Sequence, residues 1–158
     1  MNKRSVVWVI PPVLAVVLFV VDRLSKEFFL EHSVERYPVV DNWFWLQFQL
    51  NTKMALSLPL WPILYYSLVG IVLVILCGKG MQMWIRHQFG QFICVVIIIT
   101  GAVSNLLDRL YYGGVVDFVA GKLGHVFNIA DTMIVVSVIT WMIILWKHDR
   151  QKAVQTHS

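Results

Sequence analysis

Residues 89–107 read FGQFICVVIIITGAVSNLL, a stretch without a single Asp, Glu, Lys or Arg. A helix that is apolar on every side is buried either in a large protein core or in lipid. A chain of 158 residues is too short for the large core. About 20 apolar residues make a helix that crosses the roughly 30 Å hydrocarbon layer of a bilayer. The stretch therefore predicts a membrane-spanning helix.

Three further apolar blocks predict three more spans, so the expected fold class is an all-α membrane protein with four transmembrane helices. The predicted spans are approximately residues 6–21, 62–77, 89–107 and 129–146. The chain is 58% hydrophobic and 14% charged, with a mean hydropathy of +0.70, whereas soluble domains hold about 25% charged residues. We expect a single integral membrane domain over residues 1–158, ending in a polar, frayed tail at 147–158.

The first block also has features of a secretory signal peptide, because Lys3 and Arg4 precede its apolar run. No small-x-small cleavage site follows, however, and the run ends in the charged residues Asp22, Arg23 and Lys26. We therefore interpret it as a retained helix.

Basic residues predict how the spans cross the membrane, because cytoplasmic flanks carry an excess of Lys and Arg. The two termini and the loop between the second and third spans hold seven basic residues and one acidic residue. The opposite side holds six basic and eight acidic residues. Both termini are therefore expected in the cytoplasm. The pI of about 9.2 does not indicate a nucleic-acid partner, because the basic residues flank apolar spans.

Residues 37–59, between the first two spans, do not continue the helical pattern. Leu46, Phe48 and Leu50 alternate with polar residues, and a period of two predicts a half-buried strand. The aromatic residues of this stretch suit a membrane interface. We expect a small extracytoplasmic β-sheet here, with Asn51 on its polar edge.

Polar side chains gather at the predicted outer ends of the spans, where charges usually face the interior of the helix bundle and often mark function. Asp22 and Lys26 are four residues apart and share a helix face, which an interfacial ion pair explains equally well. Asp108 and Arg109 end the third span, and a structural pair is an alternative for them too.

Asp117 is the carboxylate that a structural role explains least. It lies in the apolar run Val115–Val119, where a charge needs a partner or a raised pKa. Asn128 and Asp131 open the fourth span, where an N-cap and an acid matched to the helix dipole account for them without function.

A pair of neighbouring carboxylates suggests a chemistry for this region. Such a pair shares one proton, so its ionised member takes a proton from water while its protonated member polarises a carbonyl group. This is the arrangement of an aspartic protease, which needs no metal or other cofactor. The sequence shows no His/Cys ligand cluster, and no serine has a plausible His base nearby. Spacing alone leaves Asp22, Asp108 and Asp131 as candidate partners of Asp117.

Five short motifs follow one another along nearly the whole chain. They are Asp22-x-x-Ser25-Lys26, Asn51-Thr52-Lys53-Met54-Ala55, Gly101-x-x-x-Asn105-x-x-Asp108-Arg109, Gly114-Val115-Val116-Asp117-Phe118 and Phe127-Asn128-Ile129-Ala130-Asp131-Thr132. In this order the set resembles the motifs of the bacterial lipoprotein signal peptidases, also called signal peptidase II. Each motif is weak alone, but together, on the predicted outer side, they are specific.

The resemblance implies that Asp117 and Asp131 are the catalytic pair of an intramembrane aspartic endopeptidase. It implies supporting or substrate-contacting roles for seven other positions: Asp22, Lys26, Asn51, Asn105, Asp108, Arg109 and Asn128. The implied substrate is a prolipoprotein whose lipobox cysteine carries diacylglyceryl and which is cut just before that cysteine. The implied location is the bacterial inner membrane, with the site near the outer leaflet. We expect a monomer whose partners are lipidated prolipoproteins and membrane lipid, without metal or cofactor.

Lys53 departs from the pattern, because the family has Gly there, which suits a loop with φ > 0 or a close backbone approach. We expect activity with a changed substrate preference. Two alternatives stay open. Buried polar groups also suit a small transporter or proton pathway, although the inner halves of the spans are almost wholly apolar. Lys53 alone suggests a catalytically impaired relative that binds lipoproteins. The glycine-containing segment 120–125 is expected to cover the site as a mobile element.

Overall fold

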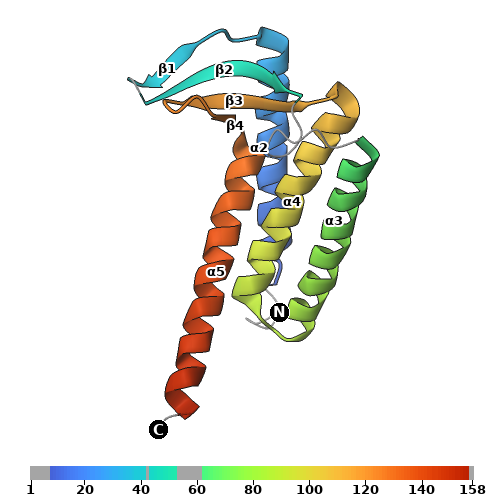
Figure 1. Cartoon of the computed structure of the whole chain (residues 1–158), viewed down its shortest axis with the longest axis vertical. Coiled ribbons are helices and arrows are strands. Elements are labelled where there is room, and N and C mark those ends of the chain that lie inside the picture. Colours follow the sequence, from blue (N-terminus) through green and yellow to red (C-terminus); the bar gives the residue numbers. More distant parts are fainter. Residues whose placement is uncertain (1–7, 42, 53–61, 157–158) are drawn as a thin grey trace.

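A computed structural model describes residues 8–41, 43–52 and 62–156 of the chain. Four helices and four strands make up these parts (Figure 1). The elements are α2 (Ile10–His32), β1 (Tyr37–Val40), β2 (Phe44–Asn51), α3 (Pro62–Ile85), α4 (Phe89–Tyr112), β3 (Val115–Gly121), β4 (Val126–Phe127) and α5 (Ile129–Thr156). Helix α4 packs against the other three helices, so it is the centre of the bundle. Lys53, the position that departs from the family pattern, lies outside the described residues.

Three of the predicted spans are confirmed as helices long and apolar enough to cross a membrane. Within the described residues these are Pro62–Ile85, Phe89–Tyr112 and Ile129–Gln151. Helix α3 buries only Gly80 and Met83 against protein, so its apolar surface requires a lipid environment. Helix α2 covers residues 10–21 of the first predicted span, but its last turns carry several charges. The count of four spans therefore stays a prediction.

The helices run further than the apolar blocks indicated. Helix α3 continues through Gly78 to Ile85, rather than ending near residue 77. Glycine weakens a helix by only about 1 kcal/mol relative to alanine, and a Cβ at Gly80 would lie 3.4 Å from Val95 of α4. Glycine thus allows the two helices to approach closely, which offsets its low helix propensity.

The other three helices also extend beyond their predicted ends. Helix α2 reaches His32, and α4 reaches Tyr112, where Gly113 adopts a φ of 71° and ends the helix. Helix α5 continues to Thr156, so the prediction of a frayed tail from residue 147 was wrong. That segment is polar but contains no Gly or Pro, and its Lys, Arg and Gln residues favour a helix.

The sheet is larger than predicted, because it also takes strands from the connection between α4 and α5. All four strands are antiparallel, in the order β1-β2-β3-β4. The apolar run around Asp117 is strand β3, and the segment 120–125, expected as a mobile cover, forms the end of β3 and the turn to β4. Periodicity missed this strand because a short apolar run does not distinguish a buried strand from a helix.

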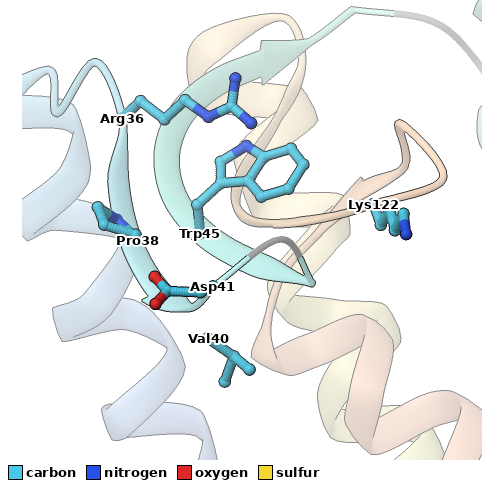
Figure 2. A pocket seen from close by; sticks show the side chains of 6 residues that line it. All are labelled: Arg36, Pro38, Val40, Asp41, Trp45 and Lys122. Carbon is cyan, nitrogen blue, oxygen red and sulfur yellow. The ribbon is translucent and has the colours of Figure 1, made fainter.

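The sheet lies across one end of the bundle, whereas α2 begins and α5 ends at the opposite end (Figure 1). Phe118 of β3 stacks on Phe29 of α2, with 4.6 Å between the ring centroids. A Cβ at Gly114 would lie 3.0 Å from the carbonyl oxygen of Asn51, so glycine permits β3 to begin directly against the end of β2. The far end of the sheet holds a pocket of about 830 Å³ (Figure 2).

Candidate active site

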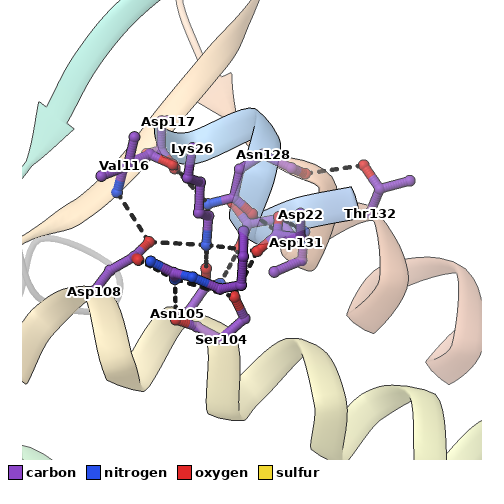
Figure 3. Close-up of polar contacts among 12 residues, drawn as sticks. Asp22, Lys26, Ser104, Asn105, Asp108, Val116, Asp117, Asn128, Asp131 and Thr132 are labelled. Atoms are coloured by element: carbon purple, nitrogen blue, oxygen red, sulfur yellow. Dashed lines mark hydrogen bonds and ion pairs between the residues drawn. The ribbon is translucent and has the colours of Figure 1, made fainter. Parts of the chain in front are cut away.

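The polar residues converge where α2, α4, β3 and the start of α5 meet (Figure 3). On α4, Gly101, Ser104, Asn105 and Asp108 follow the i, i+3, i+4, i+7 spacing of one helix face. A Cβ at Gly101 would lie 2.7 Å from the carbonyl oxygen of Ala130. Only glycine therefore allows α4 to approach the first turn of α5 this closely.

A buried ion cluster joins α2 to α4, and it consists of Asp22, Arg23, Lys26, Ser104 and Asp108. The Lys26 ammonium lies 3.0 Å from Asp22 Oδ2 and 2.8 Å from Asp108 Oδ2, and all three side chains are fully buried. The Ser104 hydroxyl donates to Asp22 Oδ2 at 2.5 Å, and Arg23 forms an ion pair with Asp108. Both carboxylates thus have a positive partner, which burial of a charge requires.

The ion cluster also holds the backbone on either side of it. Asp22 Oδ1 accepts a hydrogen bond from the backbone N–H of Ala130 at 2.9 Å. Asp108 Oδ2 accepts one from the backbone N–H of Val116 at 3.2 Å. These two residues directly precede Asp131 and Asp117. Each carboxylate of the cluster therefore fixes the backbone that carries one of the other two aspartates.

Asp117 and Asp131, called the aspartate pair below, are held by neutral amides instead. Asp117 Oδ1 accepts from Asn128 Nδ2 at 2.8 Å, and its Oδ2 accepts from Asn51 Nδ2 at 3.0 Å. Asp131 Oδ1 accepts from Asn105 Nδ2 at 2.7 Å. Amide donors orient a carboxylate without the strong preference for its charged form that a cation imposes.

Asn128 connects the two members of the aspartate pair. Its Oδ1 accepts from the backbone N–H of Asp131 at 2.8 Å, so it is the N-cap of α5, as predicted. Its Nδ2 donates to Asp117, and it also approaches Asn105 Oδ1 at 3.2 Å. Asn105 Oδ1 in turn accepts from the Lys26 ammonium at 2.8 Å. The ion cluster and the aspartate pair are thereby parts of one continuous network.

The environment of Asp117 favours a bound proton. The pKa of Asp117 is raised to about 6, mainly by burial and also by the nearby Asp131 carboxylate, against the hydrogen bonds from Asn51 and Asn128 and the charge of Lys26, which lower it. The side chain is only 2% exposed. Asp131 is half-buried. Strongly perturbed groups of this kind cluster at functional sites.

The structure brings together most of the residues singled out by sequence. Asp22, Lys26, Asn51, Asn105, Asp108 and Asn128 all lie in one network with Asp117 and Asp131. Arg109 is different. Its guanidinium lies 5.0 Å from the ring centroid of Tyr65, whereas among the described residues the cations that meet Asp108 are Arg23 and Lys26, so the suggested Asp108–Arg109 pair was wrong.

Two residues of the ion cluster were missed by sequence reasoning. Ser104 was not singled out from the other serines, although its spacing from Gly101 and Asp108 places it on the polar face of α4. Arg23 was counted only as a flanking charge, although a cation beside Asp22 in an apolar helix must find a partner. In the part of the chain that the structure describes, no three His, Cys, Asp or Glu side chains are grouped as metal ligands.

Residues 14–147 match the signal peptidase II family. This chain belongs to that family. The lipoprotein signal peptidase of Xanthomonas euvesicatoria pv. vesicatoria is 32% identical to it, over 85% of this chain and 82% of that protein. The lipoprotein signal peptidase of Streptococcus agalactiae serotype III is 28% identical, over 89% and 94% respectively. Membership of signal peptidase II identifies the chain as a protease, and the resemblance of the five motifs is thereby confirmed.

A solved structure agrees with the fold. A bacterial membrane enzyme determined by the in meso method at 2.3 Å resolution superposes with a TM-score of 0.76, over 90% of both chains, at 20% sequence identity. The match to signal peptidase II and the apolar helices together give this chain a membrane location. The alternative of a transporter or proton pathway is not favoured by these findings.

Proposed function

We propose that this signal peptidase II hydrolyses prolipoproteins with Asp117 and Asp131 as its catalytic pair. The observation that carries the proposal is the contrast among the four carboxylates of the network. Asp22 and Asp108 are each paired with a cation, whereas Asp117 and Asp131 are held by amide groups. Only a carboxylate that is not tied to a cation exchanges a proton easily near neutral pH.

The chemistry follows from one proton shared by the aspartate pair. The ionised member removes a proton from a water molecule as the water oxygen attacks the carbonyl carbon of the scissile peptide bond. The protonated member donates its proton to the carbonyl oxygen. When the tetrahedral intermediate collapses, a proton passes to the leaving nitrogen and the C–N bond breaks. Asn51, Asn105 and Asn128 support this by holding the two carboxylates in place.

The substrate of the proposed reaction is a prolipoprotein with a diacylglyceryl-modified lipobox cysteine, cut just before that cysteine. Support comes from the relatives, which are lipoprotein signal peptidases. The polar network lies at the end of the bundle that adjoins the sheet (Figure 3). A lipid-bearing substrate that moves within the bilayer can approach such a position laterally.

The proposed arrangement in the membrane has four spans, with α2 as the first. Val13, Val16 and Val17 of α2 are 54%, 62% and 52% exposed, which suits a helix surrounded by lipid. The excess of basic residues at the termini supports a cytoplasmic position for both. The aspartate pair then lies near the outer leaflet of the inner membrane. We propose a monomer, because all residues of the network come from one chain.

The test is cleavage of a diacylglyceryl-modified prolipoprotein peptide by purified protein in detergent. Asp117→Asn and Asp131→Asn should each reduce kcat by at least about 1,000-fold, because each removes a group that acts in the transition state. Asp149→Asn, which changes an exposed carboxylate on the distal part of α5, is the matched control and should retain full activity.

Two further measurements complete this test. Thermal unfolding should show that both variants remain folded, and an unmodified precursor peptide should be cut poorly by the wild type. Full activity in either aspartate variant would exclude the proposed catalytic pair. Turnover by the wild type excludes the remaining alternative, a catalytically impaired relative that only binds lipoproteins.

A further inference from the structure

A second group of polar side chains lies at the far end of the sheet, outside the aspartate pair and the ion cluster. It lines the pocket of about 830 Å³, whose walls are Arg36, Pro38, Val40, Asp41, Trp45 and Lys122 (Figure 2). We infer that this pocket, the sheet-tip pocket, binds the phosphate diester of a phospholipid headgroup. The inference rests on the membrane location of the chain and does not depend on the catalytic role of the aspartate pair.

The register of the sheet fixes the direction in which the sheet-tip pocket faces. Trp45 of β2 pairs with Ala120 of β3, and directly paired residues share one face of a sheet. Phe118 is two residues from Ala120 and points to the same face. Phe118 stacks on Phe29 of α2, so this face is the one turned toward the helices. With the helices embedded in the bilayer, the pocket opens toward the lipid surface.

The two cations of the sheet-tip pocket are suited to a phosphate group. The Arg36 guanidinium carbon lies 3.9 Å from the centroid of the Trp45 ring, which holds the guanidinium by a cation–π interaction (Figure 2). A planar guanidinium still presents its edge N–H groups to phosphate oxygens. Lys122 lies across the pocket, and its backbone N–H donates to the carbonyl of Trp43 at 2.9 Å.

Asp41 limits the charge of the ligand. Its negative charge offsets one of the two positive charges of Arg36 and Lys122, so the lining carries one net positive charge. A phosphate diester carries one negative charge and matches this balance. Inorganic phosphate and phosphate monoesters carry nearly two negative charges at pH 7, and the Asp41 carboxylate repels the second. The lining thus favours a lipid diester over free phosphate.

Apolar side chains around the sheet-tip pocket also favour a lipid source. Val40 and Trp43 are 50% and 59% exposed, and Leu123 at the turn after β3 is 89% exposed. Trp and Tyr concentrate where a protein meets the interface of a membrane, and a site for a soluble anion needs no such surroundings. A bound headgroup would hold the tips of β2 and β3, the strands that carry Asn51 and Asp117, at a fixed depth on the membrane.

The experiment measures the affinity of the detergent-purified full chain for short-chain phosphatidylglycerol by native mass spectrometry. Arg36→Gln/Lys122→Gln should bind roughly 30-fold more weakly, because each basic side chain near a lipid surface increases the affinity about fivefold. Arg150→Gln is the matched control. Its guanidinium lies 4.3 Å from the Trp146 ring near the distal end of α5, and its loss should leave the affinity unchanged.

A competition measurement distinguishes a lipid headgroup from free phosphate as the ligand of the pocket. Inorganic phosphate, added at the same concentration as phosphatidylglycerol, should not displace the bound lipid. Efficient displacement would overturn the lipid assignment. Equal lipid affinity in the double variant and the wild type would overturn the site itself. If the double variant does not fold, Lys122→Gln alone carries the test, with an expected loss of roughly fivefold. Asp117→Asn should bind lipid like the wild type, so failure of the catalytic proposal is distinguishable from failure of this one.

Discussion

The ion cluster and the aspartate pair occupy the same network but treat their carboxylates in opposite ways. In the ion cluster, Asp22 and Asp108 share the Lys26 ammonium, and Asp108 also meets Arg23. In the aspartate pair, Asp117 and Asp131 accept hydrogen bonds from asparagine side chains. Burial is nearly complete for Asp22, Asp108 and Asp117. Burial alone therefore does not distinguish the two groups.

In the proposed function, this difference divides one network into supporting and reacting carboxylates. A carboxylate paired with a buried cation serves as a fixed acceptor for backbone N–H groups. A carboxylate beside neutral amides keeps its orientation but remains able to bind a proton. The ion cluster thus supplies rigidity, through the N–H groups of Ala130 and Val116. In the proposed function, the aspartate pair supplies the reacting groups.

The largest effect in this comparison is expected from breaking the ion cluster. Lys26→Met leaves Asp22 with a buried, uncompensated charge and removes one partner of Asp108. Removing one member of a buried ion pair destabilises a protein by about 3–5 kcal/mol. Thermal unfolding in detergent should show a large fall in Tm. Lys79→Met, on the exposed face of α3, is the control and should unfold like the wild type. An unchanged Tm for Lys26→Met would mean that the cluster does not support the fold.

The next effect concerns the pH dependence of stability that arises from Asp117. Burial raises the pKa of Asp117 to about 6 from an ordinary value of 3.8, so folding favours the protonated form. The resulting stabilisation is fully present below about pH 4 and is lost as the pH rises through 6. Asp117→Asn lacks this titration. Relative to the wild type, its free energy of unfolding should therefore rise between pH 4 and pH 8, by an amount on the order of 2–3 kcal/mol, and its Tm should rise with it.

The control for this pH series is Asp149→Asn, because Asp149 is exposed and lies outside the network. Its Tm should follow the wild-type curve at every pH. Parallel curves for Asp117→Asn and the wild type would show that Asp117 is not held in a proton-binding environment, and the contrast between the two carboxylate groups would then fail.

The smallest effect is expected from replacing Asn128, which links the two members of the aspartate pair. Asn128→Ser keeps an N-cap side chain for α5 but removes the amide that donates to Asp117. A hydrogen bond to a charged group contributes at least about 1.5 kcal/mol, so kcat should fall roughly ten-fold. Asn128→Ala should lose similar activity and, in addition, about 1 kcal/mol of stability from the missing cap. Wild-type kcat in Asn128→Ser would show that orientation by this amide is not needed.

Much of the architecture was predictable because it depends on local composition. Apolar blocks such as residues 89–107 require lipid or a large core, and no neighbour alters that requirement. The four-residue spacing of Asp22 and Lys26 places them on one face in any helix, and the structure pairs them. The N-cap role of Asn128 is likewise a property of the helix start it precedes.

Tertiary structure decided which of these residues meet. Asp117 had three candidate partners by spacing, and local periodicity did not show that it lies on a strand. The pairing of β2 with β3 brings Asn51 to Asp117, and the close approach at Gly101 brings Asn105 to Asp131. Strand register and helix packing depend on contacts between segments far apart in sequence. The sequence by itself therefore determined a membrane protease with its polar residues at one end, and only the fold divided its carboxylates into a cluster paired with cations and a pair held by amide groups.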